Sequence, residues 1–167
     1  GLDDEGLYKT LGLAKELGVI VTAHCENADL IAQLQAKLLS EGKTGPKWHY
    51  HSRPPMVEAE GVHHLATFAA LHDTHIYTVH TSCRESVEVA LQAREKGVKI
   101  WIETLIQYLT HDKTDAEKPS FQGAKYVMSP PLRDRSNQDY LWNALQQGLV
   151  NTLATDPVSY THLRAHE

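Results

Sequence analysis

The sequence has few cysteines, no long apolar run and no block of basic residues, and each absence argues against a class of protein. The two cysteines, Cys25 and Cys83, are too few for a disulfide framework and fit a reducing compartment. No apolar run approaches the roughly 18 residues that a membrane span needs. The net charge of -5 comes from interspersed charges, which disfavours a nucleic-acid-binding surface. Because the acidic, polar residues 1–10 do not resemble a signal peptide, we expect a cytoplasmic protein that binds neither membrane nor nucleic acid.

Common catalytic and nucleotide-binding motifs are absent as well. The chain contains no GxGxxG or GxxxxGK[ST] segment, and neither Ser82 nor Ser129 lies in a GxSxG turn. The composition is that of an ordinary globular domain, with 41% apolar and 22% charged residues. The unusual feature is a total of 11 histidines. Histidine is the commonest neutral metal ligand and acid–base residue near neutral pH, so its placement is the first guide to function.

Short apolar runs alternate with longer amphipathic stretches, a pattern typical of β/α units around a parallel sheet. The short runs are rich in β-branched residues and predict four buried strands. These strands are expected at residues 19–24, 75–80, 98–103 and 149–156. We therefore predict an α/β fold with four consecutive β/α units, about half of an eight-stranded TIM-like (β/α)8 barrel.

Helix ends and loops can also be placed from local signals. Asp3 and Asp4 suit the start of the first helix, and Gly18 suits its end. Residues 42–55 are rich in turn formers and predict a loop. Residues 108–135 form a longer irregular segment, and a loop of that length in a compact domain usually has a function.

Three of the four predicted strands end in a residue that can bind a metal, namely His24, His80 and Asp156. The carboxyl ends of all strands open on one face of a β/α barrel, where the active site is built. Two imidazoles and a carboxylate suit Zn²⁺ or another divalent transition metal. The pattern alone leaves open the alternative that these are ordinary polar residues that meet solvent at strand ends.

Two further groups of residues also have alternative interpretations. His49 and His51 lie in the predicted loop, either as ordinary polar residues or as part of the outer wall of a site. Cys25 directly follows His24, so on a strand its side chain points to the opposite face. A buried structural thiol is favoured there over a catalytic nucleophile.

Eight segments of the chain can be compared with known families: AHCEN (23–27), HSRPP (51–55), EAE (58–60), TVHTS (78–82), IETLIQYL (102–109), GAKYVMSPPLRD (123–134), LWNAL (141–145) and ATD (154–156). In this order they resemble segments of the dihydropyrimidinases and hydantoinases of the amidohydrolase superfamily. The resemblance covers nearly the whole chain up to Asp156.

The resemblance implies a binuclear metal centre, usually zinc, that opens the cyclic amide of dihydropyrimidines or hydantoins to N-carbamoyl amino acids. It implies that His24 and His80 bind metal, that Asp156 binds one metal and moves the proton, and that the backbone of Ser129 holds the ring amide. The intact protein is then expected to be a homotetramer. The family's other metal ligands, an HxH pair and a carboxylated lysine, belong to earlier strands, so this chain alone is expected to be an inactive part of the enzyme.

The resemblance also divides the chain. Residues 1–156 match the C-terminal half of the barrel, strands five to eight, whereas residues 157–167 resemble nothing in the family and are expected to be a foreign tail. His162 and His166 in that tail therefore carry little weight. Two alternatives stay open: a non-catalytic scaffold similar to the collapsin response mediator proteins, and an allantoinase or dihydroorotase. Intact ligand positions and the SRPP and SPPLR segments favour the dihydropyrimidinase branch.

Overall fold

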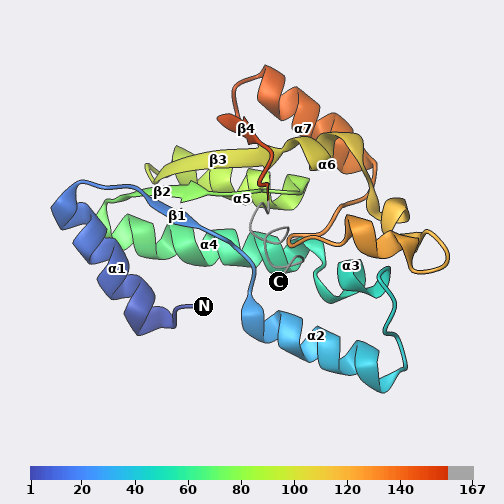
Figure 1. Cartoon of the computed structure of the whole chain (residues 1–167). Coiled ribbons are helices and arrows are strands. Elements are labelled where there is room, and N and C mark those ends of the chain that lie inside the picture. Colours follow the sequence, from blue (N-terminus) through green and yellow to red (C-terminus); the bar gives the residue numbers. More distant parts are fainter. Residues whose placement is uncertain (158–167) are drawn as a thin grey trace, which may run out of the picture.

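A computed structural model describes residues 1–157 of the chain. Its centre is one sheet of four parallel strands that lie side by side in sequence order (Figure 1). The strands are β1 (Val21–Ala23), β2 (His75–Thr78), β3 (Lys99–Leu105) and β4 (Thr152–Ala154). The predicted α/β fold with a parallel sheet is confirmed. The strand bounds differ from the predicted ones: β1, β2 and β4 are shorter than expected, and β3 ends two residues later, at Leu105.

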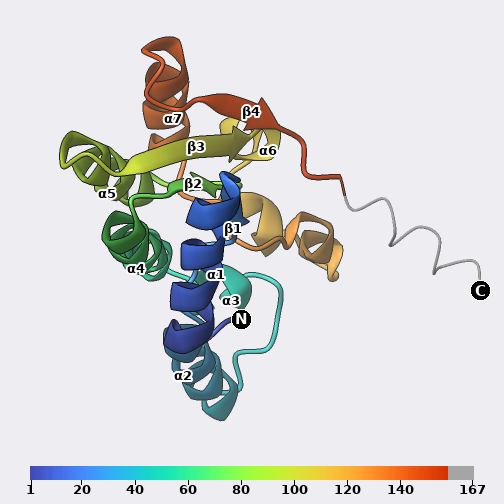
Figure 2. The ribbon, with the colours of Figure 1, turned by 90° about the vertical axis from the view of Figure 1, so that its left-hand side faces the viewer.

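Helices cover one face of this sheet. The main ones are α1 (Asp4–Leu17), α4 (Pro55–His72), α5 (Arg84–Glu95) and α7 (Ser136–Gln146). Helices α4 and α5 lie next to each other along the sheet (Figure 2). The core between the two layers includes the buried residues Leu11, Val62, Leu65, Ile76, Val87, Ile100, Ile102 and Leu141. Among the described helices, none combines the length and the apolar character needed to cross a membrane.

The other face of the sheet is open. Thr22, Tyr77 and Trp101 lie in one row across three strands, and Trp101 is 45% exposed. Thr152 of β4, which pairs with Glu103, continues this face and is also exposed. A parallel sheet usually has both faces covered, so this face is the one that further chain would have to cover.

Helix ends follow the local signals, whereas the two predicted loops contain more structure than expected. Asp3 accepts a hydrogen bond from the backbone of Gly6 at the start of α1, and Gly18 ends the helix with φ 65°. Residues 42–55 include the short helix α3, and residues 108–135 hold the end of α6 and two 3₁₀ helices. The short elements are α3 (Trp48–Ser52), α6 (Ile106–Thr110), η1 (Lys113–Glu117) and η2 (Gln122–Tyr126). A longer helix, α2 (Ala28–Ser40), precedes the first loop. Helices of five residues show too few turns to give a detectable periodicity.

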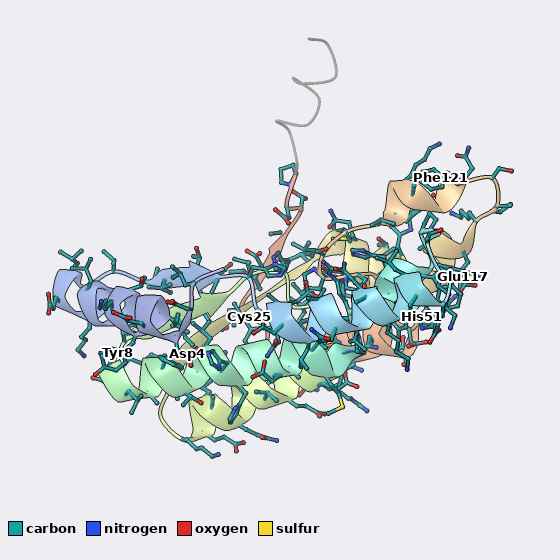
Figure 3. The ribbon with its side chains drawn as sticks, turned by 90° about the horizontal axis from the view of Figure 1, so that it is seen from below. Asp4, Tyr8, Cys25, His51, Glu117 and Phe121 are labelled. Atoms are coloured by element: carbon teal, nitrogen blue, oxygen red, sulfur yellow. The ribbon has the colours of Figure 1, made fainter. Side chains whose placement is uncertain are left out.

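A glycine lets α4 touch the backbone that follows β1. A Cβ atom on Gly61 would lie 2.7 Å from the carbonyl carbon of Cys25 and 2.9 Å from the nitrogen of Glu26. Figure 3 labels Cys25, which is buried at this contact. Because both neighbours are backbone atoms, they cannot move aside without moving the strand end.

We expect Gly61→Ala to lower the free energy of unfolding by about 1–3 kcal/mol, because the added methyl group overpacks this contact. The loss should appear even though alanine is the better helix former. Urea unfolding measures it, with Gly45→Ala as the control, since a Cβ atom on Gly45 meets nothing within 4 Å. Equal stability of the two variants would contradict the close contact.

Asp73 links three elements at the amino-terminal end of the sheet. It ends α4 with φ 47°, and its carboxylate pairs with Lys15 of α1 at 2.8 Å and Lys99 of β3 at 2.7 Å. Hydrogen bonds from Lys15 and Lys99, together with their charges, lower the pKa of Asp73 to about 2. The folded-state pKa is depressed, so the stabilisation is present above the unfolded pKa and is lost as the pH falls.

Asp73→Asn should therefore lower the Tm at pH 7 and leave the left-handed conformation intact, since asparagine tolerates it. The difference in Tm from the wild type should shrink as the pH falls from about 4, where the unfolded carboxyl titrates, toward 2. Thermal unfolding at low salt over this range tests the expectation. A difference that does not change with pH would show that the carboxylate charge plays no part.

Candidate active site

His24 and His80 meet at the carboxyl ends of neighbouring strands. His24 directly follows β1, and His80 lies two residues beyond β2. Although they are 56 residues apart in sequence, His24 Nδ1 lies 3.0 Å from His80 Nε2. The register that pairs Ala23 with Thr78 aligns the two strand ends and so brings the imidazoles together.

Glu103 holds His80 in place. His80 has φ 43°, a left-handed conformation that is uncommon for residues other than glycine. Its backbone NH donates to Glu103 Oε1 at 3.1 Å, and the NH of Thr81 donates to the carbonyl oxygen of Glu103 at 2.7 Å. Burial and the neighbouring His24 lower the pKa of His80, which keeps its imidazole neutral. Its Nδ1 is buried and has no hydrogen-bond partner among the described residues.

The second nitrogen of His24 faces a buried carboxylate. His24 Nε2 lies 3.0 Å from Glu26 Oε2, and Arg53 Nε lies 3.5 Å from the same oxygen. The Glu26 side chain is only 1% exposed, yet neither approach has the alignment of a hydrogen bond. The guanidinium of Arg53 balances the charge of this carboxylate, since a buried carboxylate is otherwise costly, and the same oxygen faces the imidazole of His24.

Asp156 lies on the other side of His80. It follows β4 with φ 43° and lines an open pocket of about 600 Å³ together with Val79, His80 and Glu103. The charge of its carboxylate acts to raise the pKa of His80, against the stronger effects of burial and His24. The structure thus brings the two histidines together and places Asp156 on the pocket that His80 lines. Within residues 1–157 no three His, Cys, Asp or Glu side chains are close enough to hold one ion.

The histidine pair fits a divalent metal. Two nitrogens that bind one tetrahedral Zn²⁺ at ~2.05 Å lie roughly 3.3 Å apart, close to the 3.0 Å between His24 Nδ1 and His80 Nε2. A neutral imidazole is the form that binds metals, and the facing carboxylate of Glu26 is the usual partner of the nitrogen that does not bind.

Ser129 belongs to the exposed segment that follows η2. His49 Nε2, from α3, lies 3.2 Å from Ser129 Oγ and 2.8 Å from the carbonyl oxygen of Met128. His49 therefore contacts a predicted site residue, which supports the interpretation that His49 forms part of the outer wall of the site. No hydrogen bond in the described part of the chain uses the backbone NH or C=O of Ser129.

A buried ion pair connects the loop after His80 with the segment after Ser129. Glu58 of α4 and Arg133 are both almost fully buried and are joined at 2.8 Å. Ser82 donates its backbone NH to Glu58 at 2.8 Å and its hydroxyl to the same carboxylate, and it accepts from Arg133 Nε at 2.8 Å. Burial alone would lower the pKa of Arg133, but the Glu58 carboxylate raises it above its ordinary value. Every member of this network has partners, as buried charges require.

Sequence reasoning missed the three glutamates of the site. Glu103 could have been found, because it ends a predicted strand just as the metal-binding candidates do. Glu26 and Glu58 lie in two of the segments that carry the resemblance, AHCEN and EAE, but the residues around them did not indicate their contacts with Arg53 and Arg133.

The cysteines behave as structural residues. Burial raises the pKa of Cys25 to about 12, and its thiol lies 3.5 Å from the carbonyl oxygen of Ala23. Cys83 is fully buried, and burial raises its pKa too. Neither thiol is ionised near neutral pH, which supports the structural interpretation over the nucleophile. His162 and His166 lie outside the described residues.

Glu58→Gln should lower the free energy of unfolding by about 3–5 kcal/mol, because it leaves the guanidinium of Arg133 buried without a counter-charge. The matched control is Glu88→Gln, which removes an exposed pair with Arg84 and should cost less than about 1 kcal/mol. Urea unfolding of both variants gives the two values. The double variant Glu58→Leu/Arg133→Met should recover part of the loss, since it buries no charge but leaves the backbone NH of Ser82 and the carbonyl oxygen of Arg53 without these partners. Similar costs for the two Glu→Gln changes would contradict the buried pair.

Comparison with known proteins identifies the relatives of this chain. No protein-family model matches it. D-hydantoinases of Geobacillus stearothermophilus and Ralstonia pickettii are 46% and 43% identical to it over 158 and 159 residues, in each case 95% of the chain. The D-hydantoinase (dihydropyrimidinase) from Thermus sp. matches 93% of the chain with a TM-score of 0.92 and 55% identity. An L-hydantoinase (dihydropyrimidinase) from Arthrobacter aurescens matches with a TM-score of 0.85 and 25% identity.

The chain spans only about a third of these relatives, 34% of the Geobacillus protein and 34% of the Thermus structure. Over that third, the chain is similar to these relatives in both amino-acid sequence and backbone structure. The predicted resemblance is therefore confirmed: the chain belongs to the family of the D-hydantoinases and dihydropyrimidinases.

Proposed function

We propose that this chain is part of a metal-dependent hydrolase that opens cyclic amides, and that residues 1–156 form strands five to eight of its barrel. The observation that carries the proposal is the approach of His24 Nδ1 to His80 Nε2, 3.0 Å apart at two adjacent strand ends, in a relative of the hydantoinases. The open face of the sheet, with Trp101 and Thr152 exposed, supports a barrel whose other strands lie elsewhere in the protein.

His24 and His80 would hold a divalent metal, with Asp156 as a further ligand. The bound metal supplies Lewis-acid chemistry, in that it polarises the amide carbonyl and makes water acidic enough to act as a nucleophile near neutral pH. The proposal also includes zinc as the metal, two ions in each site, the HxH and carboxylated lysine ligands, and a homotetramer. They rest on the resemblance alone.

The reaction adds water across the ring C–N bond. The water oxygen bonds to the carbonyl carbon, the C–N bond breaks, and the ring nitrogen gains a proton. Asp156 would accept the proton of the attacking water and pass it to that nitrogen. The backbone NH and C=O of Ser129 would hold the ring amide, since the described structure leaves both without a partner. Dihydropyrimidines or hydantoins would give N-carbamoyl amino acids.

The test uses the full-length protein from the gene that encodes this chain. We expect it to contain bound divalent metal and to hydrolyse hydantoin or dihydrouracil. His24→Ala and His80→Ala should each lower the metal content, measured by elemental analysis, and reduce kcat by about 100-fold or more. His63→Ala, an exposed histidine of α4, is the matched control and should change neither quantity. A coding sequence without an HxH motif and a strand-end lysine would refute the proposal, and so would a wild type that binds no metal.

A further inference from the structure

The peptide of Ser129 is held on both sides by side chains from other elements. The carbonyl oxygen of Met128 accepts a hydrogen bond from His49 Nε2 at 2.8 Å. The carbonyl oxygen of Pro130 accepts one from the hydroxyl of Tyr108, also at 2.8 Å. The NH and C=O of Ser129 between them take part in no hydrogen bond in the described part of the chain. The segment is therefore fixed at its two neighbours and left open at its centre.

The two side chains that fix it are well suited to do so. Tyr108, on α6 directly after β3, is only 2% exposed. Burial raises the pKa of Tyr108 well above its ordinary value, so the phenol keeps its proton and donates. For His49, burial and then the charge of Arg53 lower the pKa, so its imidazole is neutral and can donate from Nε2.

Tyr108 follows the strand that anchors His80. It lies on α6, directly after β3, and Glu103 of β3 accepts the backbone NH of His80 at 3.1 Å. Because the hydroxyl of Tyr108 donates to the carbonyl oxygen of Pro130, the Ser129 segment is tied to the same strand end.

We propose that Tyr108 and His49 are positioning residues for the substrate's ring amide, which they control through Ser129 without touching it. A cyclic amide presents one NH donor and one C=O acceptor side by side, and the free C=O and NH of a single residue complement them. Holding the flanking carbonyls fixes the direction of that pair before the substrate arrives, so less ordering is required on binding. This inference rests on the proposed function.

The experiment measures KM, kcat, bound metal and Tm for variants of the full-length protein with hydantoin as the substrate. Tyr108→Phe removes a single hydroxyl, and His49→Ala removes the other donor. Each should raise KM roughly fivefold, the value of one hydrogen bond, with kcat within about twofold of the wild type. Bound metal should stay unchanged. His49→Gln, whose amide can still donate to the Met128 carbonyl, should restore much of the lost affinity.

Tyr50→Phe is the matched control. The hydroxyl of Tyr50 donates to Asp134 at 2.7 Å, so this variant loses a comparable hydrogen bond in the same region without freeing Met128 or Pro130. Its KM should equal that of the wild type. Unchanged KM for both Tyr108→Phe and His49→Ala in an active enzyme would overturn this inference alone. A fall in kcat, metal content and Tm together would show a merely structural role and also overturn it. A wild type that does not hydrolyse hydantoin or dihydrouracil would overturn the proposed function and this inference with it.

Discussion

Parallel pairing of β1 with β2 is the constraint on which the candidate site depends. The register that sets Ala23 beside Thr78 ends both strands at one edge of the sheet, so that His24 and His80 emerge next to each other. A shift by one residue would turn every side chain of a strand to the other face and separate the imidazoles. The buried residue Ile76 and the helices behind it hold the register, since slipping would expose the apolar face to water.

Charge buried behind the site adds a second constraint. Glu58, Arg133 and Ser82 form a closed network that joins α4, the loop after His80 and the segment after Ser129. A buried ion pair of this kind contributes little net stability, because desolvation offsets the attraction. The network has a larger effect on geometry than on stability. Its three members keep their hydrogen bonds only when α4, the loop after His80 and the segment after Ser129 hold these positions relative to one another. Gly61 acts in the same direction, because it allows α4 to rest directly on the backbone beside His24.

The length of an element largely explains whether it could be predicted from the sequence. The α/β fold, the parallel strands and the end of α1 at Gly18 came from patterns that extend over several turns or are marked by one strong residue. Helix α3 and the two 3₁₀ helices were predicted as loops, because five residues are too few to show a period. Tertiary contacts such as that of Tyr50 with Asp134 accompany them, and these contacts join residues remote in sequence.

The sequence by itself determined the alternation of strands and helices, the approximate positions of the four strands with His24, His80 and Asp156 just beyond three of their ends, and, through its resemblance, the family. It did so because strand ends, caps and family segments are local features that can be found without knowing what lies opposite. Only the tertiary structure decided that Glu103 anchors His80, that Glu26 faces His24, and that Tyr108 and His49 hold the carbonyls on either side of Ser129. Each of these contacts joins separate elements, and their distances depend on how the sheet and helices pack.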